Sequence, residues 1–452
     1  MHRLLLPIIV VFVLILYNSY SNSYDSVDKN LIYQETDLDK VILSLPEVQK
    51  SKQEVYSSYY DLKLTYSQYG LNIQALYRYS YNQPVVTLNF GLSRIRISND
   101  YTYSYGIELN YPIYTFGTLE NQILSKELIY NAKILNLQQT IKDSYLKFYT
   151  LIYEYAKILN FLEFTKNNLD YTQELLSNTN KLYQAGVIPK VEYLRVFALY
   201  QDTVSQNTVA QNNSKIVLEN IYSFLYPLQK NTHNSKNALK KFIDRYTNYL
   251  SSQKQPPILI DKENQIENSL VAQIIYSNIL ALKYQKRTIE LQNAPKLALN
   301  TQYYKQRESS FSRDYLFNVN LLLSWKIFDS SLSANQAKII DNQIQILQQE
   351  YTRTKSNLIN SRNSTKSKYY NDYTLYKSYL YNLEYRTELF RLTKIKYQNG
   401  LSTYLDYLDA QNNFLQTVLN IKNYKNEIFI DIINYYYLND QDLSIKEILE
   451  II

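Results

Sequence analysis

Two stretches of the chain alternate between apolar and polar residues, which is the pattern of a β-strand with one apolar face. From Tyr101 to Ile113 the odd positions are Tyr, Ile or Leu, and the even positions are mainly Thr, Ser, Gly, Glu and Asn. The stretch 315–327 repeats this pattern, although Leu316 and Leu322 interrupt its polar side. The sequence therefore predicts two amphipathic strands that lie far apart in the chain.

A shorter alternating stretch precedes each of these strands. It runs from Ile73 to Tyr81 before the first strand and from Leu297 to Tyr303 before the second. Consecutive strands of a chain commonly pair with each other. We therefore expect one β-hairpin over about 71–114 and another over about 296–328.

Each predicted hairpin is followed by a very long stretch without Gly or Pro. The first such stretch is 118–185, and apolar residues in its middle recur in steps of four and three. These positions are Ile141, Tyr145, Phe148, Ile152, Tyr155, Leu159 and Leu162. A helix of this length would measure about 100 Å, and its heptad spacing is typical of a coiled coil.

Five further helices are predicted from similar patterns. The second half of the chain has a long helix over about 332–399. A second helix follows each long one, over about 191–226 and about 404–437. A shorter helix opens each half, over about 37–69 and about 262–292.

The chain is a tandem repeat. The segment 183–194, YQAGVIPKVEYL, aligns with 397–408, YQNGLSTYLDYL, at an offset of 214 residues. The segments 109–122 and 323–336 also align, and they keep the same offset. Two separate motifs with one offset indicate a duplicated unit.

The duplication divides the chain into two repeats. Repeat 1 covers about 24–228 and repeat 2 about 263–440. A polar linker over 229–262 joins them, and a tail over 441–452 follows the second.

The N-terminus has the features of a secretory signal peptide. A short basic start precedes an apolar run from Leu4 to Tyr17, and small polar residues follow it. This run is short for a membrane helix, which needs about 20 residues. We expect a signal peptide over 1–23, with an uncleaved membrane anchor as the alternative. No later apolar run is long enough to predict a membrane helix in the mature chain.

The composition argues against an enzyme. There is no Cys, and the two His are His2, inside the predicted signal peptide, and His233, inside a polar stretch. A thiolate nucleophile, a disulfide framework and a histidine-rich metal site are therefore excluded, and no nucleotide-binding loop is present. The net charge of +7 is spread along the chain without a basic block, so nucleic-acid binding is not indicated. We expect no catalytic residue, cofactor or metal.

An exported chain with strands of this kind fits an outer-membrane β-barrel. A soluble sheet packed on helices is the alternative. Four strands cannot close a barrel, and lipid does not tolerate open sheet edges. Three copies would supply 12 strands, whereas two copies would supply eight and leave no aqueous lumen. We therefore predict an α+β membrane protein that is a homotrimer in contact with outer-membrane lipid.

The duplicated motifs resemble those of the TolC-like outer-membrane efflux family over about 30–440. Besides the helix-turn motif, the resemblance is carried by a strand-end motif, YPIYTFG over 111–117, which includes Pro112 and Gly117. Its second copy is WKIFD over 325–329. The resemblance implies a trimer with a 12-stranded barrel in the outer membrane and a coiled-coil helical barrel about 100 Å long in the periplasm.

The resemblance also implies a function. Such proteins are passive exit ducts of tripartite efflux pumps or type I secretion systems, joined through a periplasmic adaptor protein to an inner-membrane transporter. A structural or adhesive periplasmic coiled-coil protein without a channel is the alternative. The two are distinguished by whether the trimer conducts ions.

The helix-turn motifs contain the candidate site. Gly186 and Gly400 are interpreted as helix C-terminal glycines in left-handed geometry, where an adaptor would also dock. Asp406 matches a capping box that begins at Thr403. Asp409 lies too far into the helix for capping.

By motif position, the resemblance assigns gating roles to several of these residues. Asp406 and Asp409 correspond to the acids that narrow the closed pore, and Glu192 takes the acidic position in the first repeat. Tyr397 corresponds to a latching tyrosine, with ordinary coiled-coil packing as the alternative. The family's latching arginine is replaced by Ser402.

Overall fold

The computed structural model describes most of the chain from Asp37 to Leu443. The described residues are 37–81, 83–84, 87–91, 93–96, 100–225, 243–244, 256–260, 265–307 and 315–443. The predicted signal peptide, most of the predicted linker and most of the predicted tail lie outside them.

The chain forms two compact units, and each of them contains segments of both sequence repeats. One unit contains residues 53–135 and 273–352, and the other contains 136–272 and 353–452 together with 34–52. The repeats are therefore units of sequence but not separate folded domains. A repeat that cannot bury its own apolar face needs its copy as a packing partner.

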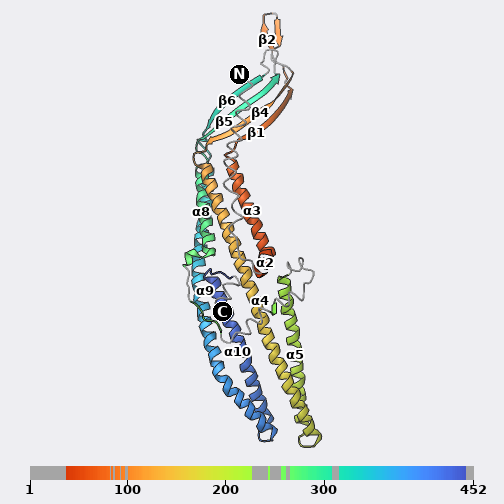
Figure 1. Ribbon diagram of the computed structural model, residues 1–452. Helices are drawn as coiled ribbons and strands as arrows, with labels where there is room; N and C mark the ends of the chain where they lie inside the picture. Colours follow the sequence, from red (N-terminus) through yellow and green to blue (C-terminus); the bar gives the residue numbers. More distant parts are fainter. Residues whose placement is uncertain are drawn as a thin grey trace. The chain divides into compact units, whose positions relative to one another are not determined.

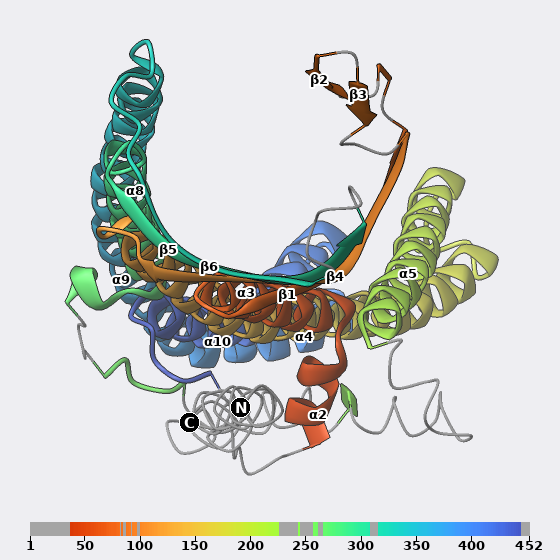
Figure 2. The ribbon, with the colours of Figure 1, turned by 90° about the horizontal axis from the view of Figure 1, so that it is seen from above.

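The first unit contains a four-stranded antiparallel sheet (Figure 1). Its strands are β1 (Asn72–Tyr81), β4 (Tyr101–Tyr114), β5 (Lys296–Arg307) and β6 (Tyr315–Ser324), in the order β1-β4-β5-β6. The two predicted hairpins are thus joined through β4 and β5 into one curved sheet (Figure 2).

The structure corrects two details of the predicted hairpins. The last strand ends at Ser324 rather than near 328. The segment of the chain that connects β1 to β4 forms a separate small hairpin of β2 (Thr87–Phe90) and β3 (Ser93–Arg96), which was not predicted. Strands of four residues are too short to show a clear alternation.

The long helices have the same lengths in both repeats. α4 (Thr118–Gln184) and α9 (Leu332–Gln398) have 67 residues each. α5 (Lys190–Phe224) and α10 (Tyr404–Leu438) have 35 residues each. Predicted long helices, a small antiparallel sheet and a tandem repeat are therefore confirmed.

The short helices differ from their predicted bounds. The first is divided into α2 (Asp37–Ser44) and α3 (Pro46–Ser67), because a proline disfavours helical geometry at the residue before it. The second is α8 (Leu270–Glu290), which begins after the 3₁₀ turn η1 (Ile266–Asn268) instead of near 262. No helix among the described residues combines the length and apolar character that a membrane crossing requires.

The core of the second unit forms along the predicted heptad positions. Tyr145, Phe148, Ile152 and Tyr155 of α4 are buried there. They pack with residues from α2, α5, α9 and α10, including Ile42, Ile221, Tyr376, Ile432 and Tyr436. In the first unit Leu62 of α3 packs on Leu119 and Ile123 of α4.

Candidate functional site

One face of the sheet is apolar and exposed across all four strands. The register pairs odd positions with odd positions, so Ile73 lies opposite Leu109, which in turn lies opposite Thr301. Tyr77 is 71% exposed and Leu321 is 65% exposed. Exposed apolar patches of this extent mark an interaction with a membrane or a partner.

The aromatic residues of this face gather at its two ends. Toward the β2–β3 end they are Tyr77, Tyr79, Tyr81, Tyr101, Tyr105, Tyr303, Tyr315 and Phe317, all exposed. Toward the helices the exposed aromatic residues are Tyr111 on this face, Tyr114 after the register shift, and Phe116, Trp325 and Phe328 just beyond the strands. Phe317 and Trp325 lie about 26 Å apart along an extended strand. Two aromatic girdles around an aliphatic band are typical of a lipid-facing barrel surface.

The opposite face is polar and is organised around one carboxylate. Glu108 is the single Asp or Glu in the four strands. Its oxygens accept hydrogen bonds from Gln74 Nε2 at 3.0 Å, Asn300 Nδ2 at 2.6 Å and Asn110 Nδ2 at 3.3 Å. The sheet therefore has one face suited to lipid and one suited to water.

The outer edges of β1 and β6 pair with no other strand among the described residues. Each strand of the sheet is antiparallel to its neighbour, so β1 and β6 run in opposite directions. A second copy could therefore add its β1 to this β6 edge and continue the antiparallel pattern.

The strand-end motif forms the turn from β4 into α4. Pro112 lies where the register between β4 and β5 shifts, and a proline is tolerated at such a bulge because it has no N–H to donate. Phe116 and Gly117 both have positive φ, at 51° and 87°. The equivalent residues of repeat 2, Ser330 and Ser331, have φ values of 52° and 64°, so the turn is duplicated.

The two helical turns have the same backbone. Gly186 and Gly400 have φ values of 72° and 71°, which confirms the predicted left-handed geometry. The N–H of Val187 donates to Leu182 O at 2.9 Å, and that of Leu401 donates to Lys396 O at 2.8 Å. Both turns are therefore Schellman motifs, which require a residue that tolerates positive φ.

A stacked tyrosine pair spans each turn, with one ring from the helix before it and one from the helix after it. The ring centroids of Tyr183 and Tyr193 are 5.3 Å apart, and those of Tyr397 and Tyr407 are 5.2 Å apart. The second pair joins the small core of Leu175, Val196, Phe390, Tyr407 and Ala410. Burial raises the pKa of Tyr397, and a hydrogen bond with Thr179 opposes that shift. Tyr397 is thus part of the coiled-coil packing between the two turns.

Asp406 is held in the predicted capping box. Its N–H donates to Thr403 Oγ1 at 3.1 Å, and its Oδ2 accepts from the Thr403 N–H at 3.1 Å. Ser402 Oγ also donates to Asp406 Oδ2 at 3.2 Å. The hydrogen bonds with Thr403 hold the pKa of Asp406 below its usual value. Ser402 therefore supports the cap instead of supplying a cation.

Asp409 is exposed and forms no hydrogen bond or ion pair among the described residues. Its equivalent in repeat 1, at the offset of 214, is Arg195. Arg195 Nη1 lies 3.4 Å from Glu192 Oε1. The predicted acids are therefore not alike, because Asp406 and Glu192 have partners and Asp409 has none in the part of the chain that the structure describes.

The sequence did not predict Arg195 and Tyr404 as members of this site. Burial raises the pKa of Tyr404 to about 12, Tyr397 and Glu192 add to this shift, and Arg195 opposes it. Tyr404 and Tyr397 both pack against the small core that contains Tyr407. The offset of 214 could have identified Arg195, because it aligns this cation in repeat 1 with Asp409 in repeat 2.

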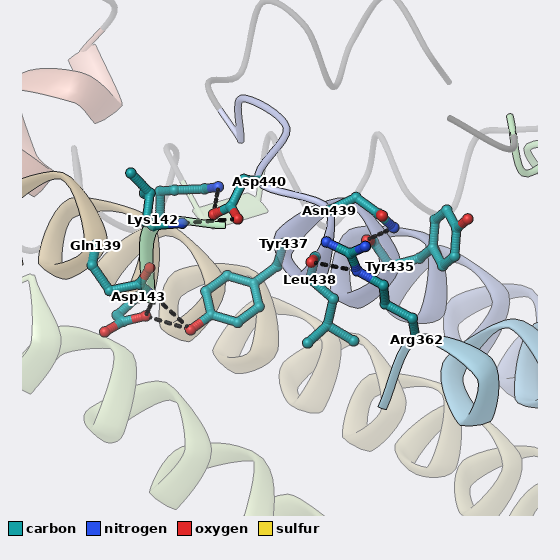
Figure 3. Close-up of polar contacts among 10 residues, drawn as sticks. Gln139, Lys142, Asp143, Arg362, Tyr435, Tyr437, Leu438, Asn439 and Asp440 are labelled. Atoms are coloured by element: carbon teal, nitrogen blue, oxygen red, sulfur yellow. Dashed lines mark hydrogen bonds and ion pairs between the residues drawn. The ribbon is translucent and has the colours of Figure 1, made fainter. Parts of the chain in front are cut away.

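The other end of α10 is tied to α4 and α9 (Figure 3). Lys142 Nζ lies 2.9 Å from Asp440 Oδ1, and both side chains are largely buried. The Tyr437 hydroxyl donates to Asp143 Oδ1 at 2.6 Å. Arg362 Nε donates to Leu438 O at 3.0 Å, which satisfies a terminal carbonyl of α10.

Comparisons with known proteins agree with this geometry. The sequence profile described as "Outer membrane efflux protein" matches residues 38–225 and 285–433, which is most of the chain. No curated protein matches the sequence.

Solved structures show the same fold. A membrane protein from Pseudomonas aeruginosa has a TM-score of 0.74 at 13% identity, covering 89% of this chain and 90% of its own. The outer membrane protein VceC from Vibrio cholerae has a TM-score of 0.73 at 12% identity, covering 90% and 96%. The CmeC outer membrane channel from Campylobacter jejuni has a TM-score of 0.68 at 14% identity, covering 92% and 89%.

Proposed function

Because the chain belongs to the outer membrane efflux protein family, we propose that three copies of it form a passive exit duct that is gated at the helical turns. The membership confirms the family resemblance of the duplicated motifs. It places the chain in the outer membrane with a periplasmic extension. The family consists of channels, so the expectation that this chain is not an enzyme is also confirmed.

The open edges of the sheet carry this proposal. A lipid-exposed sheet must pair every backbone N–H and C=O, and a single copy leaves the outer edges of β1 and β6 free. Joining β6 of one copy to β1 of the next closes the sheet without changing its antiparallel order. Three copies give a barrel whose exposed apolar face contacts outer-membrane lipid and whose polar face, with Glu108, lines the lumen.

The two helical turns form the proposed gate. Three copies of Asp409 would form a ring of unpaired carboxylates at the periplasmic tip, and such rings favour cations. Glu192, Tyr397 and the newly identified Arg195 connect the turns beside it. Asp406 contributes to the gate mainly by holding the start of α10.

The partners follow from the same arrangement. A passive duct needs an energy source, which an inner-membrane transporter would supply through a periplasmic adaptor protein. The exposed turns at Gly186 and Gly400 offer bare backbone on which such an adaptor would dock. The duct would serve either a tripartite efflux pump or a type I secretion system.

Cross-linking between copies tests the closure. The chain has no Cys, so paired cysteines can be introduced without interference. One Cys at Ser80 of β1 is combined in turn with Cys at Leu316, Asn318 or Asn320 of β6. At least one combination is expected to yield cross-linked dimers and trimers that a reducing agent separates.

The control pair is Asn110→Cys with Asn300→Cys, because these residues are direct partners within one chain. It should cross-link without changing the apparent mass. Purified trimers are then reconstituted in planar lipid bilayers. Trimers without any conductance would support the alternative of a structural or adhesive protein, and β1–β6 combinations that never link copies would overturn the proposed closure.

A further inference from the structure

A cluster of charged side chains lies between α9 and α10, far along α10 from its turn. Lys368 and Asp372 belong to α9, and Asp431 belongs to α10 (Figure 1). Lys368 Nζ lies 2.6 Å from Asp431 Oδ1 and 3.5 Å from Asp372 Oδ2. The ammonium group of Lys368 therefore forms ion pairs with two carboxyl groups.

Both carboxyl groups are buried. The side chain of Asp431 is 2% exposed and that of Asp372 is 11% exposed. Oδ2 of Asp431 has no hydrogen-bond partner among the described residues, and Oδ2 of Asp372 has only the 3.5 Å ion pair with Lys368. Burying an ionised carboxylate without full compensation is strongly unfavourable.

Other titratable groups face the cluster from α10 and α4. Glu427 of α10 lies 3.4 Å from Lys157 Nζ of α4 and accepts a hydrogen bond from the Tyr153 hydroxyl at 3.4 Å. Glu427 and Tyr153 also interact electrostatically with Lys368. The whole cluster thus has two lysines against three carboxyl groups, which leaves one negative charge unbalanced if all are ionised.

We propose that Asp431 carries a proton that holds α9 and α10 together beside Asp372 and Lys368, and that loss of this proton as pH rises loosens α10 and makes the duct easier to open. A proton on Asp431 removes one of the buried negative charges and so balances the cluster. The effect on opening rests on the proposed duct function, whereas the effect on the helix contact does not.

The electrostatics of the cluster agree with this geometry. The pKa of Asp431 is raised to about 7, mainly by burial and also by the neighbouring Asp372, whereas Lys368 opposes the shift. Burial disfavours the charged form of Lys368, but its hydrogen bond with Asp431 and the charges of Asp431, Asp372 and Glu427 together outweigh this effect and raise its pKa. Lys368 therefore stays charged while Asp431 exchanges its proton near neutral pH.

The direction of the pH effect follows from linkage. A carboxyl group whose pKa is higher in the packed state than in the loosened state binds its proton more tightly when packed. The helix contact is therefore strengthened as pH falls through about 7 and weakened as pH rises above it. With packed and loosened values near 7 and 3.8, the equilibrium for loosening shifts about tenfold between pH 6 and pH 8.

Hydrogen exchange of the full-length trimer in detergent tests the contact without requiring conductance. After correction for the intrinsic pH dependence, amides of α10 around Asp431 are expected to exchange about tenfold faster at pH 8 than at pH 6. Asp431→Asn removes the titrating carboxyl group, so it should abolish this pH dependence. Asp372→Asn removes a negative charge that raises the pKa of Asp431, so it should weaken the dependence. Using both keeps the test valid if one of them fails to fold.

Glu384→Gln is the matched control, because Glu384 is an exposed carboxylate of α9 that forms no hydrogen bond or ion pair in the described structure. It should keep the wild-type pH dependence. Equal exchange of the wild-type α10 amides at pH 6 and pH 8 would overturn the inference. Full wild-type pH dependence in the Asp431→Asn variant would overturn it as well.

Conductance provides the second measurement. Wild-type trimers in planar bilayers are expected to open more often at pH 8 than at pH 6, and Asp431→Asn trimers equally often at both. If no trimer conducts at any pH, the proposed duct fails, while the exchange result still decides whether the proton on Asp431 stabilises the helix contact. If the wild type conducts without pH dependence, the coupling between the contact and opening is wrong.

Discussion

The two helical turns share a backbone but differ in chemistry. Each has a left-handed glycine, a Schellman motif and a stacked tyrosine pair. The second helix of repeat 2 begins with the Thr403–Asp406 capping box, whereas that of repeat 1 begins at Pro189 without a side-chain cap. Arg195 in one turn corresponds to Asp409 in the other. Duplication has therefore kept the geometry of the turn while the charges at the tip have diverged.

The difference also separates structural from functional acids. Asp406 and Glu192 occupy equivalent positions near a helix N-terminus, where a negative charge is favourable with or without a pore. Asp409 lies beyond that first turn and has no partner among the described residues of its own chain. Comparison of the turns thus makes Asp409 the sharper candidate for the gate.

The largest expected difference between the turns concerns their tyrosine pairs. Tyr407 is 3% exposed, so Tyr407→Ala should destabilise its turn by about 3–5 kcal/mol. Tyr193 is only partly buried, so Tyr193→Ala should cost about 1 kcal/mol, in the range of an aromatic pair. The opening free energy of each turn is measured by hydrogen exchange. Equal losses would mean that the two pairs are equivalent in packing as well as in stacking.

The glycines should respond alike. Gly186→Ala and Gly400→Ala each place a Cβ on a residue with positive φ, at a cost of about 1–2 kcal/mol. An added Cβ would meet no other atom within 4 Å at either position, so backbone strain is the only expected penalty. Hydrogen exchange at each turn checks this. A clear difference between them would show that their shared backbone is not equally strained.

The capping box should distinguish the turns by mutation and by pH. Thr403→Ala should destabilise the start of α10 by about 1 kcal/mol. Folding lowers the pKa of Asp406 below 3.8, the ordinary pKa of Asp. The ionised carboxylate therefore stabilises the start of α10 above pH 3.8, and this stabilisation is lost as pH falls below that value. Exchange of the first amides of α10 should therefore increase in acid. Thr403→Ala should remove this acid response, and its persistence in that variant would contradict the role of the cap.

The gate should show the smallest energetic effect. Exposed charges contribute under about 1 kcal/mol, so replacing Asp409 by Asn should raise basal conductance by about two- to fivefold. The double change of Asp406 and Asp409 to Ala should also raise it. Arg195→Gln is the comparison from repeat 1, and as a loss of positive charge it should not reproduce the effect of Asp409→Asn. Unchanged conductance in the Asp409 variant would remove this residue from the gate.

Much of the local structure could be predicted from the sequence. The alternation of apolar residues located the four strands of the main sheet, and the absence of Gly and Pro located α4 and α9. The roles of Gly400 and Thr403 in the backbone were also predictable, because left-handed turns and helix caps depend on residues within four positions of each other.

Features that join distant segments were not predictable in the same way. The pairing of β4 with β5, the grouping of both repeats into each compact unit and the electrostatic effect of Arg195 on Tyr404 all depend on the approach of different helices or strands. The hydrogen bond from Arg362 of α9 to the last turn of α10 was unpredictable for the same reason, because a cap from another helix has no fixed spacing in the sequence.

The sequence by itself determined the periods, the turns and the duplication, because each is specified by neighbouring residues and repeated at one offset. Only the tertiary structure decided which charged groups lose contact with water. Asp409 stayed exposed, whereas Asp431, which has an ordinary position in the helical pattern, became buried beside Asp372 and Lys368. Burial depends on the packing of whole helices, and burial decides whether a carboxyl group is a surface charge or a proton site.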